Sequence, residues 1–228
     1  MEHDLISRII RSRRRTLALQ VAPDASLIVR APYRASPETI RRAVRRKMPW
    51  ILKKQRQARE TFRPPVRHEF IDGEEFPYLG AWRKLRVVSG AGIPLVLDEN
   101  EFLLSAAHLP EAQRLFERWY RAQAFAIIND RIKQYVAMSG LKYSRIAVTG
   151  AKKRWGSCSS KGYLNFSWRL VMAPPAMVDY VIVHELAHLA EHNHAPRFWQ
   201  KVHALFPDYR QARRWFRDNH QLLNSHFF

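Results

Sequence analysis

The chain has 228 residues, of which 46% are apolar and 26% are charged, so it can bury a substantial core, and its composition excludes an intrinsically disordered chain. Its 39 Lys and Arg outnumber its 20 Asp and Glu, and this net charge of +19 fits an anionic partner as well as it fits a solvated basic surface. The single cysteine, Cys158, excludes an intramolecular disulfide framework and a multi-cysteine zinc site. Neither an apolar run of membrane-spanning length nor a signal-peptide pattern is present, so we expect a cytoplasmic protein with no membrane partner.

The first hundred residues predict a β-rich lobe with one basic helix. Residues 16–21 and 27–30 flank a turn at Pro23, which predicts a β-hairpin. Ser36 as N-cap and Pro37 at the first helical position then predict the start of a helix, which Pro49 should bend or split. The apolar stripe of this helix comprises Ile40, Val44, Met48 and Ile51. Its other face is basic and comprises Arg41, Arg42, Arg45, Arg46, Lys47, Lys53 and Lys54.

The rest of the chain changes from strand-like to helical patterns near residues 105–110. Short β-like runs occupy 69–71, 85–88, 95–97 and 102–104. They are followed by a long helix over 110–138 that ends before Gly140, by strands at 146–149 and 163–168, and by helices over 175–192, from 196, and over 209–223. We therefore expect an α+β protein with a β-rich lobe over residues 1–105 and a mainly helical lobe with a small sheet over residues 106–228.

The segment His184-Glu185-Leu186-Ala187-His188 has the pattern H-E-x-x-H within an apolar sequence that favours a buried helix. Two histidines four residues apart lie about 40° apart around a helix and one turn along it, so both imidazoles can reach one metal ion. Glu185 projects differently and can act as general base towards a water on that ion. The pattern predicts His184 and His188 as metal ligands and Glu185 as a catalytic residue.

A catalytic zinc takes three protein ligands and keeps one open position, and the chain offers His192 and His194 as the third. On a continuous helix His192 would lie about 12 Å along the axis from His184, which is too far for bonds of about 2.1 Å to one ion. The third ligand must therefore come from a segment that turns back. Asn193 tolerates a left-handed backbone and can end the helix, so we favour His194 and keep His192 as the alternative.

The segment 152–162 is polar, is punctuated by glycine and lies between two predicted strands. Two interpretations of Arg154 stay open: it holds a substrate carboxylate or phosphate or stabilises a developing oxyanion, or it forms a structural ion pair. Cys158 fits a small buried thiol better than a nucleophile or an additional metal ligand.

With these residues the chain resembles the YgjP-like metallopeptidases, a family described as metal-dependent hydrolases and related to SprT-like zinc proteases. Three blocks carry the resemblance, and the N-terminal hairpin and Pro49-Trp50-Ile51 extend it over nearly the whole chain. The blocks are Arg154-Trp155-Gly156-Ser157-Cys158-Ser159 through Leu164-Asn165 to Trp168-Arg169-Leu170, then Asp179-Tyr180-Val181 leading into His184–His188, and then Asn193-His194 followed by Phe198-Trp199.

The resemblance implies a zincin-like catalytic lobe over residues 106–228 and zinc as cofactor. It implies that the metal is held by His184, His188 and His194, with Glu185 as base. Within and beside the first block, we expect three substrate-binding residues: Arg154, Lys153 and Asn165.

Three functions stay open on the sequence. The first is zinc-dependent hydrolysis of a peptide bond. The second is hydrolysis of a nucleoside triphosphate of the UTP type, because a nucleotide pyrophosphohydrolase activity is also attached to the family; basic residues at 152, 153, 154 and 161 would then neutralise phosphates. The third is a nucleic-acid-associated protein that carries a zinc site and binds through the basic residues at 13–15 and 41–54.

Overall fold

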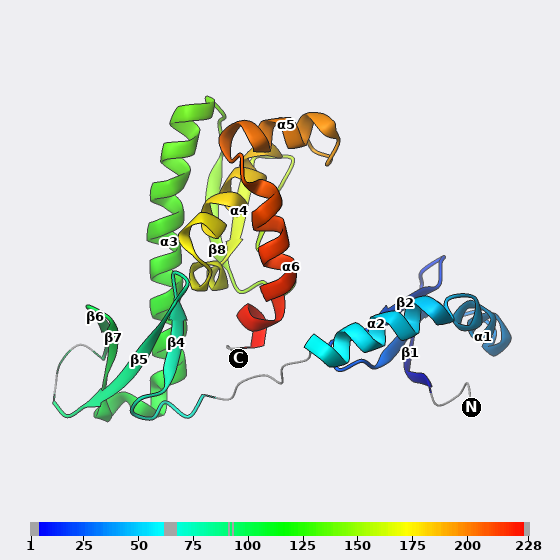
Figure 1. Ribbon diagram of the computed structural model, residues 1–228, viewed down its shortest axis with the longest axis horizontal. Coiled ribbons are helices and arrows are strands. Elements are labelled where there is room, and N and C mark those ends of the chain that lie inside the picture. Colours follow the sequence, from blue (N-terminus) through cyan, green and yellow to red (C-terminus); the bar gives the residue numbers. More distant parts are fainter. Residues whose placement is uncertain (1–4, 62–67, 91, 93, 226–228) are drawn as a thin grey trace. The chain divides into compact units, whose positions relative to one another are not determined.

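The computed structural model describes residues 5–61, 68–90, 92 and 94–225 (Figure 1). The chain divides into two compact units, Met1–Pro64 and Pro65–Phe228. Helices and small mixed sheets occur together, as expected for an α+β protein. Within the described part of the chain, no helix combines the length and the apolar character that a membrane crossing needs.

The first unit contains a three-stranded sheet with the order β1-β3-β2. Strands β2 (Ala18–Val21) and β3 (Leu27–Pro32) pair antiparallel, which confirms the predicted hairpin. Strand β1 (Ile6–Ser12) was not predicted from the sequence and pairs parallel with β3. The core of this unit consists of Leu27, Val29, Ala31, Ile40, Val44 and Ile51.

The basic helix expected from the sequence is split into α1 (Pro37–Arg46) and α2 (Met48–Thr61), as its Pro49 predicts. The hydroxyl oxygen of Ser36 accepts a hydrogen bond from the backbone N–H of Thr39, so Ser36 is the predicted N-cap. The break at Lys47 lies just before Pro49, which cannot continue a helix from the preceding turn.

The second unit begins with a four-stranded sheet in the order β4-β5-β7-β6. Its strands are β4 (Glu75–Tyr78), β5 (Ala81–Val88), β6 (Leu95–Asp98) and β7 (Glu101–Ser105). The prediction of a strand at residues 69–71 is wrong. Phe70 has a positive φ of 55°, and its backbone N–H donates to the Glu74 carboxylate, so the backbone turns here instead of extending.

The long helix α3 (Ala112–Ser139) follows the 3-10 helix η2 (Ala106–Glu111) and ends at Gly140, which has the left-handed conformation predicted for it. The ring of Phe116 on α3 lies 4.2 Å from that of Phe76 and 5.0 Å from that of Phe102, both in the sheet. The boundary expected at residues 105–106 therefore falls inside one hydrophobic core, and the compact units divide at residues 64–65 instead.

A second sheet and three helices complete the unit. The sheet has the order β8-β10-β9, with β10 (Tyr163–Ser167) parallel to β8 (Arg145–Thr149) and antiparallel to β9 (Gly156–Cys158). The 3-10 helix η3 (Trp168–Met172) leads to the helices α4 (Pro175–Ala187), α5 (Pro196–Leu205) and α6 (Tyr209–Ser225). Helix α4 lies between α3 and α6 (Figure 1). It is buried along most of its length, as its apolar sequence predicts.

Candidate metal centre

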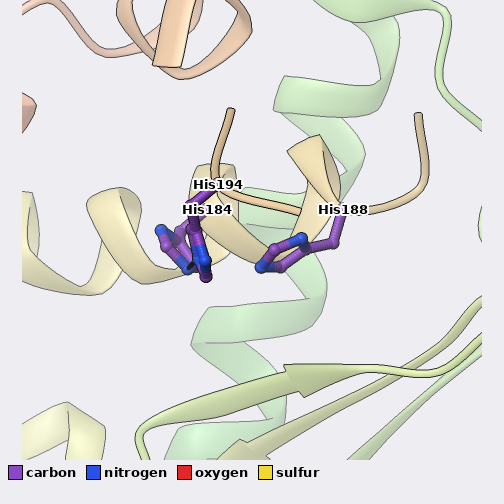
Figure 2. A group of neighbouring side chains, drawn as sticks. All are labelled: His184, His188 and His194. Carbon is purple, nitrogen blue, oxygen red and sulfur yellow. Dashed lines mark hydrogen bonds between the residues drawn. The ribbon is translucent and has the colours of Figure 1, made fainter. Parts of the chain in front are cut away.

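Helix α4 carries the H-E-x-x-H residues on its last turn. It begins at Pro175, where a missing N–H leaves no unpaired donor, and its C-cap is His188. The helix therefore ends about four residues before the end predicted from the sequence. His184 and His188 lie one turn apart, and both imidazoles reach the same place at the end of the helix (Figure 2).

The chain turns back directly after His188. The N–H groups of Leu189 and Ala190 donate to the carbonyl oxygens of Leu186 and Ala187, which closes two tight turns. The side-chain oxygen of Asn193 then accepts from the N–H of Ala195, just before α5. Asn193 thus shapes the loop before α5. The sequence interpretation that Asn193 ends α4 is wrong, because the helix already ends at His188.

The loop returns His194 to the two helical histidines (Figure 2). The ligand atoms of His184, His188 and His194 all lie within 4.8 Å of one another, and the two Nε2 atoms of His184 and His194 are 3.1 Å apart. Two nitrogens on one tetrahedral zinc are about 3.3 Å apart, given bonds of 2.0–2.1 Å, so this pair fits one ion. His192, the alternative ligand, is exposed and is not in the cluster that the described residues form.

The protonation of the histidines also suits a metal ion. The Nδ1 of His188 lies 3.0 Å from the carbonyl oxygen of Glu191, which can only accept, so Nδ1 carries the proton and Nε2 presents a lone pair. Burial lowers the pKa of His184 to about 3, with further contributions from His188 and His194, so this ring stays neutral at physiological pH. A neutral imidazole is the form that binds a metal.

Aromatic side chains of α5 pack against the three imidazole rings. Phe198 is fully buried, and its ring lies 4.5 Å from that of His188 and 4.9 Å from that of His184. The ring of Trp199 is stacked on that of His194 at 5.7 Å. Because α5 supplies both aromatic residues, its packing fixes the orientation of the three imidazole rings.

Glu185 is the catalytic residue predicted from the motif, and it is 6% exposed. Burial raises the pKa of its carboxyl group to about 8, and the positive charge of Arg154 opposes this rise. Strand β9 packs closely against it: a Cβ atom on Gly156 would lie 2.6 Å from both Cγ and Oε1 of Glu185. Gly156 belongs to the matched block of the sequence, but the sequence interpretation gave it no role.

The three expected substrate-binding residues lie on or near the sheet. Arg154 is exposed and precedes β9, close enough for its charge to act on Glu185. Lys153 is exposed beside it. The side-chain amide of Asn165 in β10 donates to the hydroxyl oxygen of Ser157 at 3.4 Å. A role of these residues in substrate binding stays a prediction.

Cys158 ends strand β9 and is half-buried. Burial raises the pKa of its thiol, and the negative charge of Glu185 raises it further. The thiol is therefore protonated at neutral pH, which agrees with the small buried thiol favoured from the sequence and does not favour a nucleophile.

A pocket of about 290 Å³ adjoins the cluster. It lies between β9, α4 and α6, and its walls include Trp155, Tyr180, His184, Glu185, Arg213 and Phe216. The sequence interpretation missed Tyr180 and Arg213 as site residues. Tyr180 carries a signal, because it lies four residues before His184 and shares its helix face, whereas Arg213 is one of several arginines in α6.

The family to which the sequence is matched agrees with a metal centre. A family model described as YgjP-like, metallopeptidase domain, matches residues 15–219. Among solved structures, the chain matches the crystal structure of the metallopeptidase zymogen abylysin from Pyrococcus abyssi with 21% sequence identity and a TM-score of 0.38. That match covers 44% of this chain and 99% of the other. No curated protein matches the chain.

Proposed function

Because the chain belongs to the YgjP-like metallopeptidase family, it is a metal-dependent hydrolase, and we propose that it is a zinc peptidase with its centre at the end of α4. The proposal rests on one observation above all: three imidazoles meet within 4.8 Å of one another beside a buried carboxyl group. Three neutral nitrogen ligands and one open position are typical of a catalytic zinc site.

His184, His188 and His194 would hold the zinc. A zinc ion bound there would polarise the carbonyl group of a peptide bond and would make water more acidic. The carbonyl of Glu191 keeps the proton of His188 on Nδ1, so its Nε2 stays available to the metal. The same role for Nε2 of His184 and His194 follows from their 3.1 Å separation.

Glu185 would take a proton from the attacking water and later deliver it to the leaving amine. Burial raises the pKa of this carboxyl group to about 8 in the metal-free protein. The charge of a bound zinc ion would lower the pKa again, so that the carboxylate could accept a proton near neutral pH and release it afterwards. Burial against the backbone of Gly156 keeps the carboxyl group in one place during both transfers.

Arg154 is proposed to stabilise negative charge on the substrate, since its own charge reaches Glu185 and its side chain is exposed. Lys153 and Asn165 would contact the substrate on the same side, next to β9. The family favours a peptide substrate over the nucleotide and the nucleic acid that the sequence left open.

The proposal is tested with wild type and Glu185→Gln, each analysed for metal content and for hydrolysis of casein and of the four nucleoside triphosphates. We expect one zinc per chain in both proteins and casein cleavage by the wild type alone. Casein cleavage by Glu185→Gln at the wild-type rate would remove Glu185 from the mechanism. Release of pyrophosphate without cleavage of casein would replace the peptidase with the nucleotide hydrolase.

A further inference from the structure

The pocket beside the metal centre contains a cation that the hydrolytic chemistry does not use. Arg213 on α6 lines this pocket together with His184 and Glu185 of α4. Among the described residues, no carboxylate forms an ion pair with Arg213. An arginine in a binding pocket without an acidic partner is a ready site for an anion of the substrate.

The guanidinium group of Arg213 is held in place by stacking. Its Cζ lies 4.4 Å above the centre of the Trp199 ring, and the same ring stacks on that of His194. Arg213 also acts on the pocket electrostatically. Its charge opposes the effect of burial, which raises the pKa of Tyr180 to about 12. The planar donors of Arg213 are therefore positioned next to the metal centre before a substrate arrives.

The walls of the pocket favour an anion that is carried by an apolar residue or lies next to one. Trp155 and Phe216 have ring centres 5.4 Å apart, and Tyr180 lies 6.0 Å from Phe216, so three aromatic side chains form the apolar part. Arg213 is the one Lys or Arg among the described residues that line the pocket. A triphosphate requires several cations, whereas one guanidinium group matches one carboxylate through two parallel hydrogen bonds.

We propose that Arg213 is a specificity-determining residue that binds a carboxylate of the peptide substrate, while Trp155, Tyr180 and Phe216 accept the apolar residue that carries it or adjoins it. The carboxylate belongs either to the C-terminus of the substrate or to an Asp or Glu side chain. This inference rests on the proposed peptidase function and adds the class of substrate. It assigns Arg213 no part in bond cleavage.

The first test measures binding and does not require turnover. N-acetyl-L-phenylalanine and its amide are titrated into the full-length, zinc-loaded protein and into the zinc-free protein, with tryptophan fluorescence as the readout. We expect the acid to bind at least about tenfold more tightly than the amide in both forms, since a charge-assisted hydrogen-bond pair is lost with the amide. Equal affinities for acid and amide in the zinc-free protein would overturn the proposal.

Matched variants assign the effect to Arg213. Arg213→Ala should bind the acid and the amide with about equal affinity. Arg213→Lys should retain part of the preference for the acid because the charge remains. The control is Arg214→Ala, which removes the same charge from the next residue of α6; both arginines are exposed, but Arg214 does not line the pocket. An equal loss in Arg213→Ala and Arg214→Ala would overturn the proposal, because it would indicate a general field effect. Melting temperatures check that all three variants fold.

The second test uses cleavage and separates the two sources of the carboxylate. Peptides of one sequence are compared with a free and an amidated C-terminus, and with Glu and Gln at each position flanking the cleaved bond. A preference for the free C-terminus or for Glu, measured as kcat/KM and abolished in Arg213→Ala, supports the proposal and identifies the source. Cleavage of all peptides at the same rate would overturn the inference and leave the peptidase intact.

A protein that cleaves none of these peptides would contradict the proposed function, and the binding test would still decide the role of Arg213. Competition by UTP for the N-acetyl-L-phenylalanine site, with a larger loss of UTP binding than of acid binding in Arg213→Ala, would overturn the carboxylate assignment in favour of a phosphate.

Discussion

The backbone of Gly156 lies directly against the carboxyl group of Glu185, so that a Cβ atom at this position would approach Oε1 to 2.6 Å. Glycine is therefore required by the close approach of β9 to the Glu185 side chain, and no unusual φ is involved. Through this contact β9, an edge strand of its sheet, positions the side chain of Glu185 on the buried helix α4.

Substitution Gly156→Ala should reduce kcat because the added methyl group displaces the Glu185 carboxyl from its position. We expect a loss of about tenfold or more in kcat, since a misplacement of about 1 Å can reduce turnover by up to a hundredfold. Zinc affinity should change little, because the three atoms nearest to the added methyl group all belong to Glu185. The variant Ser160→Ala, at an exposed position in the turn after β9, serves as control in steady-state kinetics and metal analysis. An unchanged kcat in Gly156→Ala would show that the carboxyl group can move without consequence.

The two residues that compete for the third ligand position allow a matched pair of variants. His194→Ala should lower zinc affinity by at least about a hundredfold, since a direct ligand is lost and the loss of an outer-sphere partner alone produces ten- to hundredfold effects. His192→Ala lies two residues away in the same loop, is exposed, and should bind zinc like the wild type. Competition with a chromogenic chelator measures both affinities. A larger loss in His192→Ala than in His194→Ala would mean that the metal centre is built on a different third ligand.

Much of this centre follows from the sequence, because its parts are set by local periodicity. The spacing of His184 and His188 fixes their shared face on a helix, and the rise per residue excludes His192 from the same ion on a continuous helix. Periodicity also predicts the α+β pattern, and the residue types at Ser36 and Pro37 predict the helix cap. These features depend on residues within one or two turns of each other.

Other parts of the site depend on contacts that sequence spacing does not encode. Gly156 acquires its role only when β9 pairs with β10 and comes to rest on α4. Arg213 is one of several arginines in α6, and only the packing of that helix selects it for the pocket. The domain boundary failed for a similar reason: the change from strands to a helix near residue 105 coincides with a continuous core around Phe102 and Phe116.

In the zinc-free protein, two groups with opposite pKa shifts should lower stability in two overlapping pH ranges. The folded pKa of His184 is about 3 against an ordinary 6.5, so its contribution is present above pH 6.5 and is lost as the pH falls towards 3. The folded pKa of Glu185 is about 8 against 4.5, so its contribution is present below pH 4.5 and is lost as the pH rises towards 8.

Denaturant unfolding in the presence of a chelator tests this between pH 5 and pH 9. Glu185→Gln removes the buried carboxylate, so the free energy of unfolding of the zinc-free variant should exceed that of the wild type at pH 9 by on the order of 2–4 kcal/mol. At pH 5 the two proteins should differ much less, since the wild-type carboxyl is then protonated. A constant difference across the pH range would mean that Glu185 is not buried in its neutral form.

Helix α4 is anchored to α3 by an ion pair remote from the metal. Arg131 donates to Oδ2 of Asp179 at 2.6 Å, and the Asp179 residue is 8% exposed. Burial raises the pKa of Asp179, and the charge of Arg131 opposes this rise. Because the pair fixes α4 five residues before His184, its loss should affect stability first and the metal centre only through the position of the helix.

Arg131→Ala should reduce the free energy of unfolding by about 1–3 kcal/mol at pH 7, which allows for the partly exposed arginine. Without Arg131 the folded pKa of Asp179 rises further, so more of its carboxyl is protonated as the pH falls. The loss of unfolding free energy should therefore shrink as the pH falls towards 4. The variant Arg131→Ala with Asp179→Asn has no charge at either position of this pair and should recover part of the stability at pH 7. Equal losses in the single and the double variant would show that Arg131 stabilises the helix through packing of its side chain and not through its charge.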